Sequence, residues 1–461
     1  MTSCVYVEPP IAQWYCRYVR SIDVSSSRLN SVAKRSLLLK RRETGVRAMP
    51  HERLDVTQRA VVAATMLALC IGGIEPAWSS DHFDSPAMTA NPQADIADVY
   101  AWTAPDGRRL NLVMTVVGHS LSDRLQYVLH IDSGKTFGHT TASTTITCRF
   151  PTPKLASCKL GNSDRVDGDA SNIGGLRSRN GRFQLFAGLR DDPFYNNVKG
   201  SISAYGVGLA AMKGGSAPPD AAGCPQLDAK ATKAVADQWR HTDGGPATNL
   251  LGNWTASAIV VSVDLDAISA GGSILAVWGS AATSKRLLDR MGRPFVGNTL
   301  LGVSPFSTDD ASGDEREKFN EVGVKGGGTF ETRIEGSLAF QDSLDGECGN
   351  QLLAEKMPAS PARYRALAKM FADDRLWVNS AVRECKQFLA VELAALAGRT
   401  AYRADCGGRS PVYDTPNMWR SLLVQGTTNE IAWDGLLGDE HRPSATDFPF
   451  LAPPDPKGVD H

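Results

Sequence analysis

The stretch Leu110-Asn111-Leu112-Val113-Met114-Thr115-Val116 decides the fold, because large apolar residues occupy every second position from Leu110 to Val116. A second stretch, Leu125-Gln126-Tyr127-Val128-Leu129-His130-Ile131, repeats the same alternation. Successive side chains of a β-strand point to opposite faces of the sheet, so a period of two predicts a strand with one buried and one wet face. We therefore expect two strands here.

Other strands are expected in the same part of the chain. Phe183 to Leu189 alternates in the same way, whereas Ser257 to Leu265 and Ile274 to Trp278 are nearly continuous apolar runs. These patterns predict a mainly β fold with a β-sandwich-like body, assigned to residues 80–340.

The pattern changes between Pro361 and Gly398, where apolar residues recur at helical spacing. We assign residues 341–442 to a helical subdomain that completes the same fold, which is α+β overall. The proline-rich residues 443–461 are expected to form a surface tail that does not pack.

The hydrophobic run Ala60 to Ile74 follows arginine residues and, at 15 residues, is shorter than the about 20 that a membrane span needs. With the small-residue pattern Ala77-Trp78-Ser79 behind it, this run is typical of a secretory signal peptide. We predict a signal peptide over residues 49–79, export to the periplasm or the medium, and no transmembrane anchor after cleavage before Ser80.

Residues 1–48 carry nine Lys/Arg against three Asp/Glu and show no periodic apolar face. Because a signal peptide does not normally follow such an extension, we expect Met49 to be the true start and residues 1–48 to be over-extended or unstructured. A transit segment and a cytoplasmic tail are the alternatives. Lipid anchoring at Cys70 is less favoured, since Leu69 stands where a small residue is required.

The charge of the predicted mature chain argues against nucleic acid as a partner. Beyond residue 79 the chain retains 38 basic and 44 acidic residues, a formal net charge of −6. A nucleic-acid-binding protein normally has the opposite sign, with basic residues gathered on one face.

The cysteine count favours disulfides. Six cysteines follow the predicted signal peptide: Cys148, Cys158, Cys224, Cys348, Cys385 and Cys406. An even number in an exported chain indicates up to three disulfides. We expect Cys148 to pair with Cys158 across a hairpin, and Cys348 to pair with either Cys385 or Cys406. Zinc is the rival interpretation, but no Cys-x-x-Cys occurs.

The predicted mature amino terminus, Ser80-Asp81-His82, is a candidate metal site. A terminal amine, two backbone amides and the His82 imidazole form a square-planar nitrogen set that suits Cu²⁺ or Ni²⁺. The structural alternative is a hydrogen-bonded corner formed by His82 and Asp84.

A second candidate site is made of carboxylates. Asp84, Asp95 and Asp98 lie near the start of the mature chain, and Asp191-Asp192 directly follow a predicted strand. Several hard oxygen ligands are what Ca²⁺ requires. In the structural alternative, Asp95 or Asp98 caps a turn and Asp191-Asp192-Pro193 forms an Asx-type turn before Phe194.

Five motifs together resemble, in order, the landmarks of a bacterial exported family catalogued as domain of unknown function 4331. They are residues 79–86 (SSDHFDSP), 94–102 (ADIADVYAW), 186–194 (FAGLRDDPF), 289–294 (DRMGRP) with Asn298-Thr299, and 447–452 (DFPFLA). The resemblance implies export and one family-wide fold, and it supplies no activity. One departure is Asp132-Ser133-Gly134-Lys135, which has fewer oxygen ligands than the acidic, glycine-rich loop often found there in the family.

Nucleophilic and phosphate-binding motifs are absent from the sequence: it has no Gly-x-Ser-x-Gly, no His-Glu-x-x-His and no Gly-x-x-x-x-Gly-Lys-Ser/Thr. We therefore expect a disulfide-stabilised binding protein with a structural divalent cation and an unknown ligand or protein partner. The alternative is a metal-dependent envelope enzyme that uses His82, Asp84, Asp191 and Asp192. An enzyme should gather ionisable groups with shifted pKa values in a pocket, whereas a binding module should show a flat or apolar patch.

Overall fold

The structure is a computed structural model that describes residues 85–302, 309–355, 357–428 and 434–456. All of these residues belong to one compact unit of the chain, residues 75–461. The unit is rich in strands and carries most of its helices in its C-terminal part, which confirms the predicted fold class.

One sheet has five antiparallel strands in the order β1-β2-β11-β8-β7. Its members are β1 (Ile96–Thr103), β2 (Arg109–Val116), β7 (Leu176–Arg177), β8 (Phe183–Asp191) and β11 (Thr255–Asp264). The predicted strands at residues 110–116, 183–189 and 257–265 are thus all present, side by side in this sheet.

The second sheet has seven antiparallel strands, with the path β13-β12-β3-β4-β5-β6 and with β14 paired to β12. Its members are β3 (Gln126–Gly134), β4 (Ala142–Arg149), β5 (Leu155–Leu160), β6 (Asp164–Asp169), β12 (Ile274–Ala282), β13 (Leu287–Met291) and β14 (Leu376–Asn379). A small hairpin of β9 (His241–Thr242) and β10 (Gly245–Pro246) stands apart.

The two sheets share an apolar core. At Gly279 in β12 an added Cβ would lie 2.6 Å from Met114 Cε in β2 and 3.1 Å from Val99 Cγ2 in β1, so the sheets are in direct contact there. In β3 the exposure alternates as predicted, with Tyr127, Leu129 and Ile131 buried. In β2 it does not, because every residue after Arg109 is buried. This strand lies inside the sheet and other parts of the chain cover its second face.

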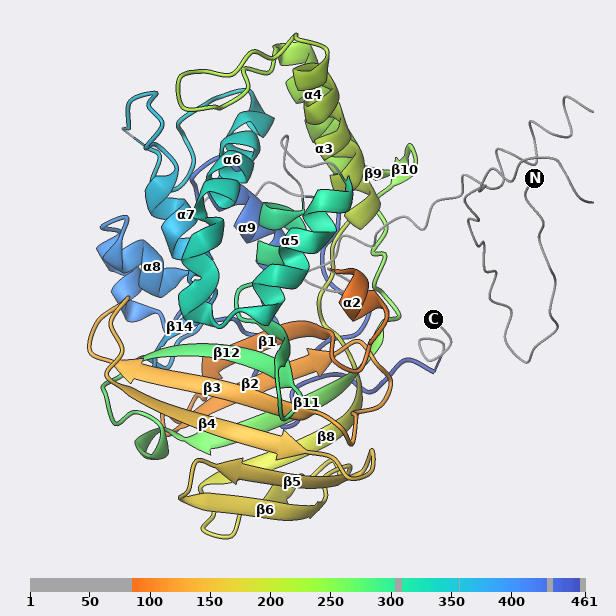
Figure 1. The fold of residues 1–461 in the computed structure, drawn as a ribbon, viewed down its shortest axis with the longest axis vertical. Coiled ribbons are helices and arrows are strands. Elements are labelled where there is room, and N and C mark those ends of the chain that lie inside the picture. The colour runs from red at the N-terminus through yellow and green to blue at the C-terminus, as the bar shows by residue number, and fades with distance from the viewer. Residues whose placement is uncertain (1–84, 303–308, 356, 429–433, 457–461) are drawn as a thin grey trace, which may run out of the picture. The chain divides into compact units, whose positions relative to one another are not determined.

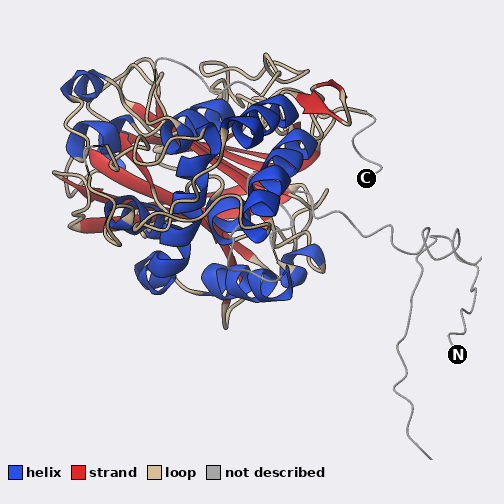
Figure 2. Cartoon of the chain, turned by 90° about the horizontal axis from the view of Figure 1, so that it is seen from above, coloured by secondary structure: helices blue, strands red, loops and turns tan. Residues whose placement is uncertain are grey.

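Helices gather at the end of the sheets that is marked by β1, β12 and β14, whereas β5 and β6 lie at the opposite end (Figure 1). Seen from above, the helices cover the strands (Figure 2). The α-helices are α2 (Pro86–Thr89), α3 (Val198–Lys213), α4 (Ala229–Trp239), α5 (Asp309–Glu321), α6 (Glu331–Asp342), α7 (Arg365–Ala372), α8 (Ala390–Ala395) and α9 (Thr415–Val424). The 3-10 and π segments are η1 (Leu265–Ala267), η2 (Val296–Leu301), η3 (Val324–Phe330), η4 (Ser343–Asp345) and η5 (Thr400–Ala404).

The helices begin earlier in the chain than residue 341. The pair α3 and α4 interrupts the series of strands, and α5 and most of α6 also precede that position. Within the described ranges, no helix combines the length and the apolar character of a membrane span.

The C-terminal segment packs, contrary to the expectation of an unpacked surface tail. Phe450, Leu451 and Ala452 are buried, and the Phe450 ring lies 4.8 Å from the Trp102 ring in an edge-on contact. Trp102 Nε1 also donates a hydrogen bond to the Ala445 carbonyl at 2.9 Å. The proline content indicated an extended backbone, and such a backbone packs well when apolar residues dock on a sheet.

Three disulfides are present: Cys148–Cys158, Cys224–Cys348 and Cys385–Cys406. The first confirms the expected hairpin pair, since Cys148 in β4 and Cys158 in β5 are direct neighbours across the sheet. The expectation for Cys348 was wrong, because this residue pairs with Cys224 in the loop between α3 and α4. Closeness along the chain suggested the C-terminal partners, whereas the packing of α4 near η4 brings Cys224 to Cys348.

Candidate functional site

The predicted Asp191-Asp192 pair is split between two environments. Asp191 is the last residue of β8, and its N–H donates to the Ala452 carbonyl at 3.2 Å. The N–H of Asp192 donates to the Trp254 carbonyl at 3.0 Å. Neighbouring side chains in an extended chain point to opposite sides, so the two carboxyl groups separate.

Asp192 has a structural role. Its Oδ1 accepts hydrogen bonds from the Tyr100 hydroxyl at 3.0 Å and from the Phe194 N–H at 3.3 Å, and its Oδ2 accepts one from Thr115 Oγ1 at 2.5 Å. The bond to Phe194 is the Asx-type turn that was the structural alternative. Asp192 is buried and well satisfied by donors.

Asp95 and Asp98 are the two predicted acids near the start of the described chain, and they interact with residues other than Asp191. Asp98 is buried and forms an ion pair with the Arg409 guanidinium, which also lies over the Tyr100 ring. Asp95 is fully buried, and its backbone carbonyl accepts a hydrogen bond from the Val117 N–H at 3.0 Å. His82 and Asp84 lie outside the described residues, as do the predicted signal peptide and residues 1–48.

Asp191 faces a different set of polar groups, supplied by the loop that follows residue 434. His441 Nδ1 lies 3.1 Å from Asp191 Oδ1, and His441 Nε2 lies 3.9 Å from Asp455 Oδ2. The Asp191 and Asp439 carboxyl groups form a hydrogen bond with each other, which requires one shared proton. The 434–443 loop and the C-terminal segment that follows it therefore meet around Asp191, although they lie about 250 residues further along the chain.

Asn249, in the loop before β11, orients the two acids of the 434–443 loop. Its Nδ2 donates to Asp439 Oδ1 at 3.1 Å and to Glu440 Oε2 at 2.9 Å. Gly252 makes room for the second of these acids, because a Cβ there would lie 2.4 Å from both Glu440 carboxylate oxygens.

The loop is anchored at its described start. Asp434 is buried, its Oδ2 lies 3.4 Å from Arg420 Nη1 in α9, and it accepts a hydrogen bond from the Asn197 N–H at 3.0 Å. Asn197 is the N-cap residue of α3. The loop is thus tied to two helices immediately before it reaches Asp191.

Burial is the largest cause of the raised pKa values of Asp191 and Asp439. It raises the pKa of Asp191 to about 7, and the negative charges of nearby acids, Asp192, Glu440 and Asp455, add to the effect. Burial likewise raises the pKa of Asp439 to about 9, and its hydrogen bonds to Glu440 and Asp191 contribute. The pair therefore keeps a proton at neutral pH.

Four other buried acids of the described chain each form an ion pair with an arginine. The pairs are Asp98–Arg409, Asp374–Arg290, Glu392–Arg293 and Asp434–Arg420, and all eight side chains are at most 3% exposed. Within the described part of the chain, Asp191 and Asp439 form an ion pair with no lysine or arginine. Asp191 Oδ2 and Asp439 Oδ2 are buried and receive no hydrogen bond from an N–H or hydroxyl donor of a described residue.

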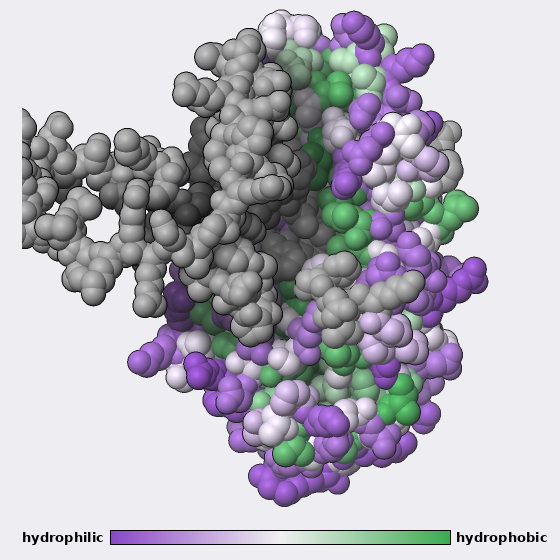
Figure 3. All heavy atoms as spheres, turned by 90° about the vertical axis from the view of Figure 1, so that its right-hand side faces the viewer, coloured by the Kyte–Doolittle hydropathy of each residue, from purple (hydrophilic) through white to green (hydrophobic). Residues whose placement is uncertain are grey.

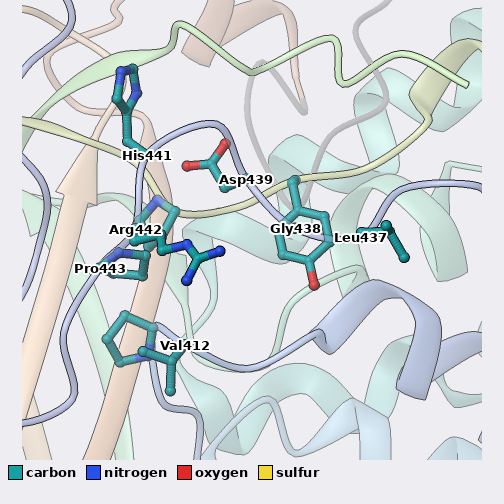
Figure 4. Close-up of a pocket in the computed structure, with 10 residues that line it drawn as sticks. Val412, Leu437, Gly438, Asp439, His441, Arg442 and Pro443 are labelled. Carbon is teal, nitrogen blue, oxygen red and sulfur yellow. The ribbon is translucent and has the colours of Figure 1, made fainter.

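Asp439 and His441 line a pocket of about 440 Å³. In Figure 4 these two side chains occupy one side of it, Val412 stands on the other, and the Arg442 guanidinium lies between them. Tyr195 also lines the pocket, and its hydroxyl is hydrogen-bonded to Asp414, the N-cap residue of α9. Of the two carboxyl groups, that of Asp439 lines the pocket and that of Asp191 does not.

No group of three or more His, Cys, Asp or Glu side chains in the described ranges has the arrangement of a metal site. The prediction of a divalent cation at Asp84, Asp95, Asp98, Asp191 and Asp192 stays a prediction, as does that of Cu²⁺ or Ni²⁺ at His82.

Together, the fold and the site define a disulfide-stabilised, strand-rich protein with a pocket just beyond the end of β8 that Asp439, His441 and Arg442 line. Comparison of the chain with protein-family models, with curated proteins and with solved structures finds no match.

Sequence reasoning found Asp191 but missed its partners Asn249, Asp439, Glu440, His441 and Asp455. One local signal was available, since Asp439-Glu440-His441-Arg442 is a run of four ionisable residues next to a glycine. Such a run is usually a solvated loop, so only its docking against β8 marks it as a candidate site.

Proposed function

We propose that this chain is an exported binding protein whose ligand presents a positively charged organic group to the Asp191–Asp439 pair. Export is supported by the signal-peptide pattern before Ser80 and by the three disulfides, which persist in oxidising compartments. Membership of the exported family that the five motifs resemble is part of the same proposal.

The observation that carries the proposal is a pair of carboxyl groups, on buried Asp191 and half-buried Asp439, that has no lysine or arginine partner in the described residues; only the His441 imidazole lies beside Asp191. Burial of ionisable groups is costly unless opposite charge compensates it. A bound ammonium group would supply that charge and would take the place of the shared proton.

The pocket favours an organic cation over a bare metal ion. A volume of about 440 Å³ is within the range of small-molecule sites, and its lining includes Tyr195, Val412 and Leu437 beside the acidic group. A bare metal ion has no apolar surface that could contact this lining.

The test is calorimetric titration of the folded, disulfide-intact protein at pH 8 with hexane-1,6-diamine and, separately, with calcium chloride. We expect the diamine to bind and Asp439→Asn to weaken it at least tenfold, about 1.4 kcal/mol. Asp191→Asn should also weaken diamine binding. Asp123→Asn, which changes an exposed acid before β3, is the matched control and should leave the affinity unchanged.

Two outcomes would count against the proposal. If hexane-1,6-diol binds as well as the diamine, positive charge is not what the site recognises. If calcium binds with an affinity that depends on Asp191 and Asp439 while the diamine does not bind, the site belongs to a divalent cation instead.

An acid–base enzyme is the second candidate function. The specific observation in its favour is that Asp191 and Asp439 have pKa values near 7 and 9, which suits one group to accept and the other to donate a proton near neutral pH. A binding protein returns its ligand unchanged, so mass spectrometry of ligand recovered after long incubation separates the two candidates.

A further inference from the structure

The pocket is lined by Asp439 of the carboxyl pair and also by the basic residues His441 and Arg442. Arg442 is the last of the four ionisable residues 439–442, is exposed, and forms no ion pair with any described residue. Its guanidinium lies in the pocket between Asp439 and Val412 (Figure 4). A second charge, of opposite sign to the first, is therefore presented to the same space.

Two large apolar side chains complete the lining. Leu437 is 93% exposed and Val412 is 55% exposed, which makes them two of the most exposed large hydrophobic side chains in the described chain. They come from different segments, the 434–443 loop and the turn before α9, and they line one pocket with Asp439 and Arg442. Solvent-exposed apolar groups beside convergent polar ones are typical of a ligand site.

We infer, on the basis of the function proposed above, that the ligand is zwitterionic: an amino acid or short peptide with a free amino group, a free carboxylate and a hydrophobic side chain. The ammonium group binds the carboxyl pair at Asp439 and the carboxylate binds Arg442. The hydrophobic side chain covers Leu437 and Val412, and these two residues set the preference for apolar ligands.

Each contact has a physical basis. A guanidinium offers two parallel N–H donors to a carboxylate, so Arg442 suits this group better than a point charge would. The ammonium group has three N–H donors, and the Oδ2 atoms of Asp191 and Asp439 accept no hydrogen bond from an N–H or hydroxyl donor of the described residues. Closing an apolar side chain over Leu437 removes apolar surface of both partners from water.

The experiment uses four probes on the folded, disulfide-intact protein at pH 8: the dipeptide Leu-Leu, its C-terminal amide, its N-acetyl derivative, and Gly-Gly. We expect Leu-Leu to bind about fivefold more tightly than its amide, because an exposed ion pair contributes modestly. It should bind at least tenfold more tightly than Gly-Gly, because a leucine side chain is buried against Leu437 and Val412.

Two variants test whether Arg442 and Leu437 cause these differences in affinity between the peptides. In Arg442→Gln the acid and the amide should bind equally, and in Leu437→Ser the advantage of Leu-Leu over Gly-Gly should shrink at least threefold. The matched controls are Arg124→Gln and Ile173→Ser, which change an exposed arginine and an exposed apolar residue elsewhere and should behave as wild type.

Binding of the diamine and binding of the peptides test the amine site and the zwitterionic ligand separately. If hexane-1,6-diamine binds but Leu-Leu and its amide bind equally in the wild type, the amine site stands and the zwitterionic ligand is excluded. If N-acetyl-Leu-Leu binds as tightly as Leu-Leu, recognition of an amino group is excluded and both proposals fall. Absence of binding by the diamine and by all four peptides has the same consequence.

Discussion

At the scale of single residues, the contrast between Asp191 and Asp192 is the most informative feature of the site. Both are buried and adjacent in sequence. Asp192 receives three hydrogen bonds from donors, whereas Asp191 shares a proton with another acid. An arrangement like that of Asp191 costs stability, and such costs are concentrated at functional sites.

The stability of the protein should therefore depend on pH through Asp191 and Asp439. An unfolded aspartate titrates near pH 3.9, whereas these two titrate near 7 and 9 in the folded protein. Between about pH 4 and pH 9 the folded state binds more protons than the unfolded state, so the free energy of unfolding falls as pH rises.

We expect the free energy of unfolding of Asp439→Asn to fall much less with rising pH than that of the wild type. At pH 8 its free energy of unfolding should exceed that of the wild type by at least about 1.4 kcal/mol, the equivalent of one pKa unit. Urea unfolding at pH 5 and pH 8 measures both effects. Asp123→Asn serves again as the control, and a fall with pH that persists undiminished in Asp439→Asn would contradict the assignment.

Ligand binding should show the opposite dependence on pH. An ammonium group binds the ionised carboxyl pair, so affinity should rise as pH increases from about 7 to about 9 and level off above that range. Calorimetry in buffers of different ionisation enthalpy should detect proton release on binding at pH 8. Uptake of protons would show that another group controls binding.

The pair Asp98–Arg409 has a different role, although Asp98 was also a candidate ligand. Both side chains are at most 1% exposed. Removal of one partner leaves a buried charge without compensation, so Arg409→Met should destabilise the protein by about 3–5 kcal/mol. Thermal melting should register this, and Asp98→Asn combined with Arg409→Met should recover part of the loss.

At the scale of elements, the C-terminal segment completes the site. Residues 444–456 run beside the ends of β8 and β11, where Ala452 accepts a hydrogen bond from Asp191 and the Asp455 N–H donates to Thr255 Oγ1 at 3.1 Å. The segment therefore holds Asp191 at one end and brings Asp455 to His441.

Phe450→Ala should release this segment. Loss of a buried phenylalanine costs about 3–5 kcal/mol, and here it should also weaken diamine binding because Asp191 loses its backbone partner. Chemical denaturation and titration measure the two effects. Leu155→Ala, at a residue 46% exposed, is the apolar control, and unchanged stability of Phe450→Ala would mean that the segment does not pack in solution.

At the scale of the whole molecule, the disulfides differ in the length of chain that they close. Cys224–Cys348 spans 124 residues and joins the loop after α3 to the segment after η4, whereas Cys148–Cys158 spans 10 residues within one hairpin. The entropy that a cross-link removes from the unfolded chain grows with loop length.

Replacement of Cys224 and Cys348 by serine should therefore cost about 2 kcal/mol more than the same replacement of Cys148 and Cys158. The second double variant is the matched control for the first, and melting curves compare them. Six reactive thiols in the native mature protein would contradict the presence of any of the three disulfides.

The sequence by itself determined five of the strands, the presence of C-terminal helices and an even number of cysteines available for disulfides, because alternation, helical spacing and cysteine count are local or countable properties. Only the tertiary structure decided which distant segments meet. Asp191 and His441 lie 250 residues apart and are joined because β8 ends beside the loop anchored by Asp434. Strand order, disulfide pairing and the pocket at Asp439 depend on such docking, and a pattern of period two contains no information about it.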